Sequence, residues 1–317
     1  MEPQDISKNG LRGSLVRLVF FSSLSVFLFS LEALSPFLGF WSRLATPLPL
    51  ALLGYRDGLK WMRGGTLLAA AVLLGMFPLS LSLYFLLGYV PLAFALVHAS
   101  RRSWQGSEAL LMCVLVSILA ELLLLCVFFS LTGRNLLVPD AEALSRSYAE
   151  LPLQEGQAAA LREALTRMGS LLPYIVPSMI LLSSGLHSAV NYRLCEYFQR
   201  GRPQSPPSLP PFTDWRFSKT LLPALFLSYF LGALWTPEEW LEGAMFAVNL
   251  KLVLNILFFV EGLSLAFWWV DRRKFKPAWR FMTIFILMIP VMWLWLIFLG
   301  IADIVFDVRA RARRGPV

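Results

Sequence analysis

The chain has 317 residues, of which 57% are hydrophobic and only 15% are charged, and its mean hydropathy is +0.64. Soluble domains usually carry about 25% charged residues, so this composition excludes an ordinary soluble protein. The net charge of +8 does not indicate nucleic acid, because the basic residues lie in short clusters between apolar runs. The sequence predicts an all-α polytopic integral membrane helix bundle, with the lipid bilayer and its anionic headgroups as a partner.

Apolar runs long enough to cross a hydrocarbon core of about 30 Å recur along the chain. The second of these runs is the weakest, because Arg43, Pro47 and Pro49 interrupt it. The first run is too long for a signal-peptide core, so we expect it to be a retained span. The candidate spans are 15–35, 36–55, 64–80, 82–98, 107–131, 170–196, 221–235, 244–270 and 279–306.

Basic residues in short loops set the expected orientation of the chain. The acidic segment 237–243 and the segment 133–169 are expected on the outer side. Nine spans then place the arginine-rich tail, 309–314, on the outer side as well, against the same rule. The alternative is eight spans, with either 36–55 or the last run re-entrant or interfacial. Neither count places every loop as the positive-inside rule requires. The regions expected to be cytoplasmic are the N-terminus, 56–63, 101–102, 193–219 and 272–280.

Two polar segments divide the chain. Residues 134–168 have helical spacing of apolar positions, which predicts an amphipathic helical segment over the outer mouth of the bundle, either a lid or a packing cap. The Pro- and Ser-rich stretch 200–218 predicts an extended cytoplasmic linker. The linker separates an N-terminal bundle of five or six spans, 1–199, from a C-terminal three-helix segment with a basic tail, 219–317.

Ionisable and amide side chains inside spans are costly and mark a site by default. Such side chains would together line a polar cavity. The alternative is that each carboxyl is protonated, or bonded to a neighbouring helix, and only fixes packing. Pro173 and Pro177 can kink the sixth span, as in helices that line substrate cavities. The candidate ligand-binding residues are Glu121, His187, Asn191, Asn255 and Glu261.

The motifs of soluble enzymes are absent from the sequence. It contains no GxxxxGK[ST], HExxH or GxSxG pattern. Its two histidines and three cysteines lack the spacing of a metal site or a disulfide framework. We therefore expect no enzymatic activity, no catalytic residues, no cofactor and no metal.

Four stretches carry a resemblance to a known family. They are TPLPLALLGYRDGLKWMRGG at 46–65, LPPFTDW at 209–215, EGLSLAFWW at 261–269 and LGIADIVFDVR at 299–309. Together they resemble the bacterial YybS-like membrane proteins of the DUF2232 family, across nearly the whole chain. The resemblance implies a bacterial cytoplasmic (inner) membrane location, and the basic residues of the N-terminus place that end in the cytoplasm. The resemblance also implies a glutamine at the position of Glu261, which favours a hydrogen-bonding role there over an obligatory charge.

The front half, with its proline-bracketed second run, basic turn and glycine-rich helices, is also similar to the S components of energy-coupling-factor transporters. That similarity implies a membrane-embedded subunit that binds a small molecule in a cavity open to the outside. It would depend on a transmembrane coupling protein with ATPase subunits for energy. Two other hypotheses stay open: a proton-coupled secondary carrier in which Glu121 takes up and releases the proton, and a membrane scaffold of an envelope or division complex.

Overall fold

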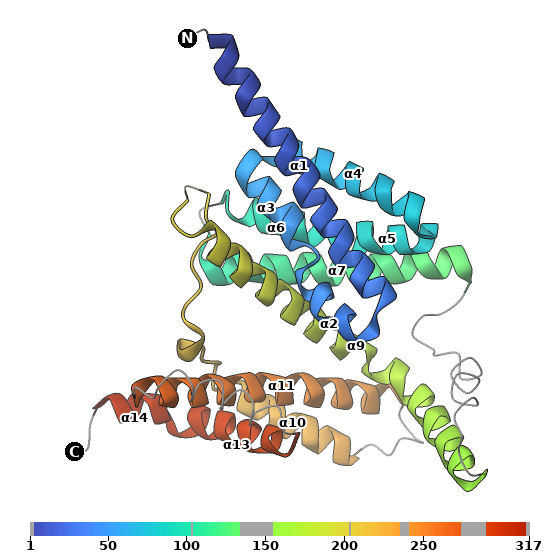
Figure 1. Cartoon of the computed structure of the whole chain (residues 1–317). Coiled ribbons are helices and arrows are strands. Elements are labelled where there is room, and N and C mark those ends of the chain that lie inside the picture. Colours follow the sequence, from blue (N-terminus) through green and yellow to red (C-terminus); the bar gives the residue numbers. More distant parts are fainter. Residues whose placement is uncertain are drawn as a thin grey trace. The chain divides into compact units, whose positions relative to one another are not determined.

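The computed structural model describes residues 3–102, 104–133, 155–202, 204–234, 241–273 and 290–314. Within these ranges the chain is helical and contains no strand, which confirms the all-α fold class (Figure 1). Four helical stretches are long and apolar enough to cross a membrane: Leu11–Leu34, Leu79–Ala99, Gly106–Thr132 and Met245–Arg272. Shorter apolar helices at Leu221–Leu231 and Met292–Phe306 add to these, so the chain is a polytopic membrane helix bundle.

The chain divides into two compact units. Unit 1 contains Met1–Val138 and Ile180–Leu209, and unit 2 contains Pro139–Met179 and Pro210–Val317. The boundary at Leu209 falls inside the Pro- and Ser-rich stretch. The segment predicted to be an amphipathic cap lies outside the described residues from 134 to 154, and its remainder begins α9 (Glu155–Gln199).

Unit 1 is built from α1 to α7 and the later part of α9. Its helices are α1 (Pro3–Leu34), α2 (Pro36–Ala45), α3 (Leu48–Asp57), α4 (Leu59–Met76), α5 (Leu79–Gly88), α6 (Val90–Ala99) and α7 (Gly106–Thr132). The expected span 36–55 is two helices, because Pro47 and Pro49 lack the backbone donors that would continue α2. The expected span 82–98 bends at Tyr89 between α5 and α6, where Pro91 cannot bond the carbonyl of Leu87.

The core of unit 1 lies where α1, α3, α4, α6 and α7 pack together. Phe29, Leu50, Met62, Phe85 and Leu96 are each at most 1% exposed. Many large apolar side chains on the opposite helix faces are exposed, among them Leu67, Leu119 and Phe129. An apolar exterior of this kind is what a helix surrounded by lipid presents.

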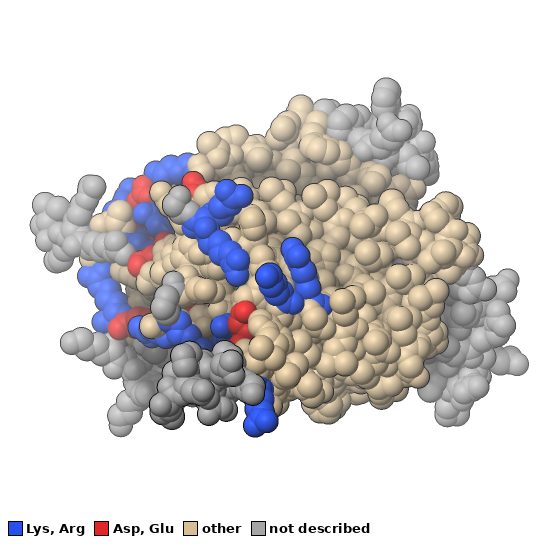
Figure 2. Space-filling model, turned by 90° about the horizontal axis from the view of Figure 1, so that it is seen from above, with Lys and Arg blue, Asp and Glu red and all other residues tan. Residues whose placement is uncertain are grey.

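Basic side chains gather where α3 ends, α4 begins, and α6 and α9 end. Arg56, Lys60, Arg101, Arg102 and Arg202 are all exposed there. On the face drawn in Figure 2, lysine and arginine collect toward one side and wide areas carry none. This clustering follows the loops that the sequence assigns to the cytoplasm.

The part of the Pro- and Ser-rich stretch that belongs to unit 1 packs against the helices of that unit. Tyr192 donates a hydrogen bond to the carbonyl of Pro207 at 2.7 Å, and Leu209 is 5% exposed in the core of unit 1. Gly106 sits so close to the backbone of Ser208 that an added Cβ would lie 2.5 Å from its carbonyl oxygen. The stretch is therefore anchored to unit 1 over Pro207 to Leu209.

Unit 2 contains η1 (Phe212–Asp214), α10 (Leu221–Leu234), α11 (Leu241–Arg272), α13 (Pro290–Phe306) and α14 (Val308–Arg314), with the earlier part of α9. α11 and α13 cross where the backbones of Gly262 and Gly300 meet. A Cβ on Gly262 would collide with the carbonyl of Leu296, and one on Gly300 with that of Phe258. Small residues allow helices to pack this closely. α10 packs against the same pair of helices, with Leu225 in one apolar cluster with Phe258 of α11.

α11 and α13 run in the same direction. The ring of Phe259 packs on Trp293 near the start of α13, while Arg272 at the end of α11 donates a hydrogen bond to the carbonyl of Ala312 beyond the end of α13. Nine spans would require 244–270 and 279–306 to cross the membrane in opposite directions, and the parallel course of α11 and α13 does not fit that count. The tail lies beside Arg272, at the end of unit 2 that the positive-inside rule assigns to the cytoplasm.

Candidate functional site

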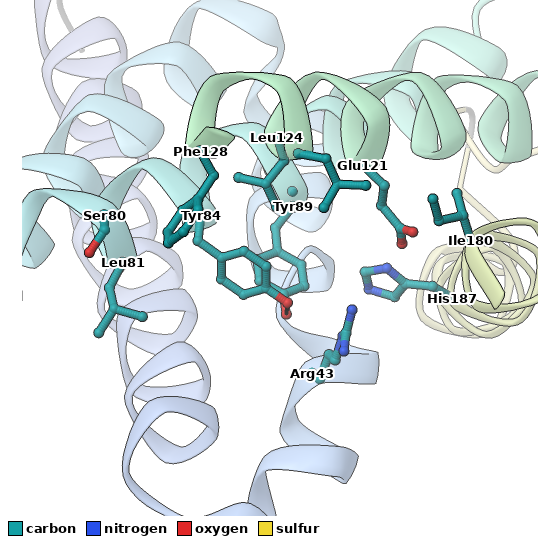
Figure 3. Close-up of a pocket in the computed structure, with 12 residues that line it drawn as sticks. Arg43, Ser80, Leu81, Tyr84, Tyr89, Glu121, Leu124, Phe128, Ile180 and His187 are labelled. Atoms are coloured by element: carbon teal, nitrogen blue, oxygen red, sulfur yellow. Dashed lines mark hydrogen bonds between the residues drawn. The ribbon is translucent and has the colours of Figure 1, made fainter. Parts of the chain in front are cut away.

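Unit 1 contains a cavity of about 560 Å³ among α2, α5, α7 and α9. Ligand pockets usually have volumes of about 300–1,000 Å³. One wall is apolar, with Leu81, Leu124, Leu125, Phe128 and Ile180. The remaining wall is polar and includes Arg43, Tyr84, Tyr89, Glu121 and His187 (Figure 3).

Two tyrosines of the polar wall hold a carboxylate, that of Glu32, which does not itself line the cavity. The hydroxyl of Tyr89 donates to Glu32 at 2.6 Å, and the hydroxyl of Tyr84 lies 3.3 Å from Glu32 Oε1. Arg43 Nε lies 4.0 Å from the same oxygen. Glu32 therefore has two hydroxyl donors and one cationic neighbour, Arg43, whose charge it offsets.

The hydrogen-bond donor that the described residues give Glu121 is a neutral hydroxyl. The hydroxyl of Ser183 on α9 lies 3.1 and 3.3 Å from the two carboxylate oxygens of Glu121. No lysine, arginine or histidine in the described residues forms an ion pair with Glu121 within 4.0 Å. In Figure 3 the carboxylate of Glu121 points toward the same space as the imidazole of His187 and the guanidinium of Arg43. The carboxylate is thus available to a group inside the cavity.

The face of α9 that carries His187 is polar and incompletely satisfied. His187 is 6% exposed, and its Nε2 has no hydrogen-bond partner among the described residues. The same holds for Ser188 Oγ, Asn191 Oδ1 and, on α7, Ser117 Oγ. Buried polar groups are nearly always paired, and His187 lines the cavity, so water or a ligand inside the cavity can complete its Nε2.

Asn191 lies next to the cavity without lining it. Its side-chain amide donates to the carbonyl of Leu44 at 2.7 Å and to that of His187 at 2.9 Å. These bonds attach the end of α2 to α9. Asn191 therefore helps to position Arg43, which lies one residue before Leu44, and His187.

Glu261 belongs to a separate buried ion cluster in unit 2. Arg309 Nη2 lies 3.1 Å from Glu261 Oε1, and Arg309 Nε lies 2.8 Å from Asp303 Oδ2. All three side chains are at most 1% exposed. Glu261 also accepts a hydrogen bond from the backbone of Phe217 at 2.8 Å. Glu121 lies in unit 1 and Glu261 in unit 2, and each carboxylate has its described partners within its own unit.

The ion cluster fastens the chain segment before α10. Arg309 donates to the carbonyl of Thr213 at 2.7 Å, and Ser264 donates to that of Phe212 at 2.6 Å. At the surface nearby, Lys219 and Arg216 bind Asp307 at 2.7 and 2.6 Å and lower its pKa. These contacts give Glu261 a structural role in holding the linker and the tail.

Asn255 is a partly buried residue of α11 and does not line the cavity. Asn249, one and a half turns earlier, makes the polar contacts in unit 2 that sequence analysis did not assign. Its side chain accepts from the backbone of Ser178 at 2.9 Å and donates to the carbonyl of Tyr174. Asn249 thereby joins α11 to the part of α9 that directly follows Pro173.

Sequence reasoning missed Glu32, Arg43, Tyr84 and Tyr89. Glu32 lies at the end of the first apolar run, where a carboxylate is unremarkable, and Arg43 was interpreted only as an interruption of the second. The available signal was an acidic and a basic residue eleven positions apart inside two adjacent apolar runs. Their contact with each other and with Tyr89 depends on how α1, α2 and α5 pack.

The fold and cavity define a polytopic membrane protein with a polar chamber in its N-terminal unit. Comparison with protein families matches residues 23–304 to a model described as "Predicted membrane protein (DUF2232)", so the chain belongs to the DUF2232 family. It is 24% identical over 294 residues to the uncharacterized protein YybS of Bacillus subtilis (strain 168), covering 88% of this chain and 91% of that protein. These matches confirm the resemblance to the YybS-like proteins of the DUF2232 family. No solved structure matches the chain significantly.

Proposed function

We propose that this protein is a membrane-embedded binding subunit that captures a small molecule in the unit 1 cavity, in the manner of an S component of an uptake system. The observation that carries the proposal is the unpartnered Nε2 of His187, buried beside Arg43 and Glu121 at a cavity of about 560 Å³. An apolar wall with a few convergent polar groups is the usual form of a ligand pocket. Without an ATP-binding loop in the sequence, such a subunit depends on a coupling protein and ATPases for energy.

The test fills the cavity without changing its charge. Leu124 of α7 lines the cavity and is 9% exposed, whereas Leu123 is 52% exposed on the outer face of the same helix. Leu124→Trp and its control Leu123→Trp are purified in lipid nanodiscs and compared with the wild type by native mass spectrometry. We expect a small molecule to co-purify with the wild type and with Leu123→Trp and to be lost from Leu124→Trp. Equal occupancy in both variants, with both monodisperse, would contradict the proposal.

A second candidate, a proton-coupled carrier, is favoured by one observation. Glu121 is a carboxylate in a membrane helix without a cationic partner among the described residues, which suits a group that takes up and releases a proton. Proteoliposomes that contain only this chain separate the two functions. A carrier should transport the co-purifying molecule unaided, and its Glu121→Gln variant should not. A capture subunit should bind the molecule without transporting it.

A further inference from the structure

Resting on the proposed function, we infer that the ligand of the unit 1 cavity is a monocationic amphipathic amine, whose ammonium group binds the carboxylate of Glu121 and whose apolar body lies on Leu124 and Phe128. Among the described residues, Arg43 and Glu121 line the cavity and Glu32 contacts its lining residues Tyr84, Tyr89 and Arg43. The sign of the ligand's charge follows from how the charges of these two carboxylates and Arg43 are distributed and from the partners that they already have.

Arg43 and Glu32 already offset each other. Glu32 receives the hydroxyl of Tyr89 at 2.6 Å and lies 4.0 Å from Arg43. Glu121, by contrast, receives the neutral hydroxyl of Ser183 and forms no ion pair within 4.0 Å among the described residues. With both carboxylates ionised, Glu32, Arg43 and Glu121 together carry one negative charge in excess, and Glu121 is the carboxylate that forms no such ion pair among the described residues. A low-dielectric surrounding makes an uncompensated charge costly, so a single positive charge in the cavity is favoured.

The other ligand charges fit less well. An anion bound to Arg43 would raise the excess negative charge of the group from one to two. A zwitterion has no net charge, so it would leave the excess at one. A cation brings the group to neutrality. The ring of Tyr84 lines the same cavity, and aromatic faces attract cations. His187 Nε2, which has no partner, can accept a hydrogen bond when the imidazole is neutral.

The apolar wall of the cavity indicates that the rest of the ligand is apolar. Leu124, Leu125 and Phe128 lie on α7 on the same side of the helix as Glu121, at spacings of three, four and seven residues. A molecule that places its ammonium at Glu121 therefore lays its body along the next two turns of α7. Figure 3 shows Leu124 and Phe128 on the helix that carries Glu121.

The test uses three probes with one apolar body and different head groups: 4-phenylbutylamine, 4-phenylbutanol and 4-phenylbutanoic acid. Binding of each probe to the full chain in uncharged maltoside micelles is measured by equilibrium dialysis. We expect the amine to bind at least about tenfold more tightly than the alcohol and the acid, since a charge-assisted hydrogen bond is roughly twice as strong as a neutral one.

The variant Glu121→Gln keeps the shape of the side chain and removes its charge, and should reduce the affinity for the amine about tenfold or more, to the level of the alcohol. The matched control is Glu108→Gln, on the same helix 13 residues earlier. Glu108 accepts from the backbone of Gln105 at 2.9 Å in a capping box, and glutamine serves at that position equally well. This control should leave amine binding unchanged, which shows that the loss in Glu121→Gln is specific to that carboxylate.

The outcomes separate the two proposals. Tighter binding of the acid or the alcohol than of the amine, or equal amine binding by the wild type and Glu121→Gln, overturns the assignment of a cationic ligand and leaves the binding function standing. Failure of all three probes to bind, together with no co-purifying molecule in nanodiscs, overturns both.

Discussion

Removing the side chain of Arg309 should release the tail and the linker of unit 2. Arg309 is 1% exposed and binds Asp303, Glu261, Ser264 and the carbonyl of Thr213. In Arg309→Met, two buried carboxylates lose their shared cation. Removing one partner of a buried ion pair typically costs about 3–5 kcal/mol. At about 1.4 kcal/mol for each factor of ten, the opening equilibrium of the segment rises by roughly 10²- to 10³-fold.

The assay is limited trypsin digestion of the protein in micelles, with cleavage after Arg311 and Arg216 followed by mass spectrometry. The wild type should be cut slowly at these sites and Arg309→Met rapidly. The triple variant Arg309→Met, Glu261→Gln and Asp303→Asn removes the charges together and should recover much of the protection, because no buried charge is left unpaired. Slow cleavage of the single variant would refute the reasoning that Arg309 holds the tail, as would a triple variant cut as fast as the single one.

Three further changes test other contacts. Tyr89→Phe removes a 2.6 Å hydrogen bond to a carboxylate and should lower the free energy of unfolding by about 1.5–3 kcal/mol, measured by denaturant titration in micelles. Gly262→Ala forces a collision at the crossing of α11 and α13 and should cost about 1–3 kcal/mol, whereas Gly75→Ala, with open space around it, should stabilise the protein slightly; equal melting temperatures would contradict this. Burial opposes ionisation of Asp57, but hydrogen bonds from Arg17 and Ser14 outweigh it and lower the pKa of Asp57. The stabilisation from this pair is complete above the ordinary aspartate pKa of about 3.9 and is lost as pH falls through the lowered pKa, so an acid titration should destabilise the wild type more than Asp57→Asn.

The helical membrane class was predictable because it depends on local composition. Each apolar run is long enough to be a helix in lipid, whatever its neighbours are, since a helix satisfies its own backbone hydrogen bonds. Proline positions also act locally, so the weakness of the second run at Pro47 was visible in the sequence and appears as the break between α2 and α3. The choice of Glu121 as a residue of interest rested on the same local reasoning.

The partners of those residues were decided by tertiary packing. Glu121 and Glu261 looked equivalent in the sequence, each a carboxylate in an apolar run, yet Glu261 meets Arg309 and Glu121 meets only Ser183 among the described side chains. Hydropathy cannot make this distinction, because it records the cost of burying a charge and not the identity of the group that offsets it. The direction of α13 was likewise undecided by charge counting alone.

The sequence by itself determined that this protein is a bundle of membrane helices and which side chains are costly to bury there. Only the tertiary structure decided that Glu32 offsets Arg43, that His187 keeps an unpaired nitrogen, and that a cavity lies between them. The physical reason is range: backbone hydrogen bonding and hydropathy act within one helix, whereas the partner of a buried charge comes from a helix far away along the chain.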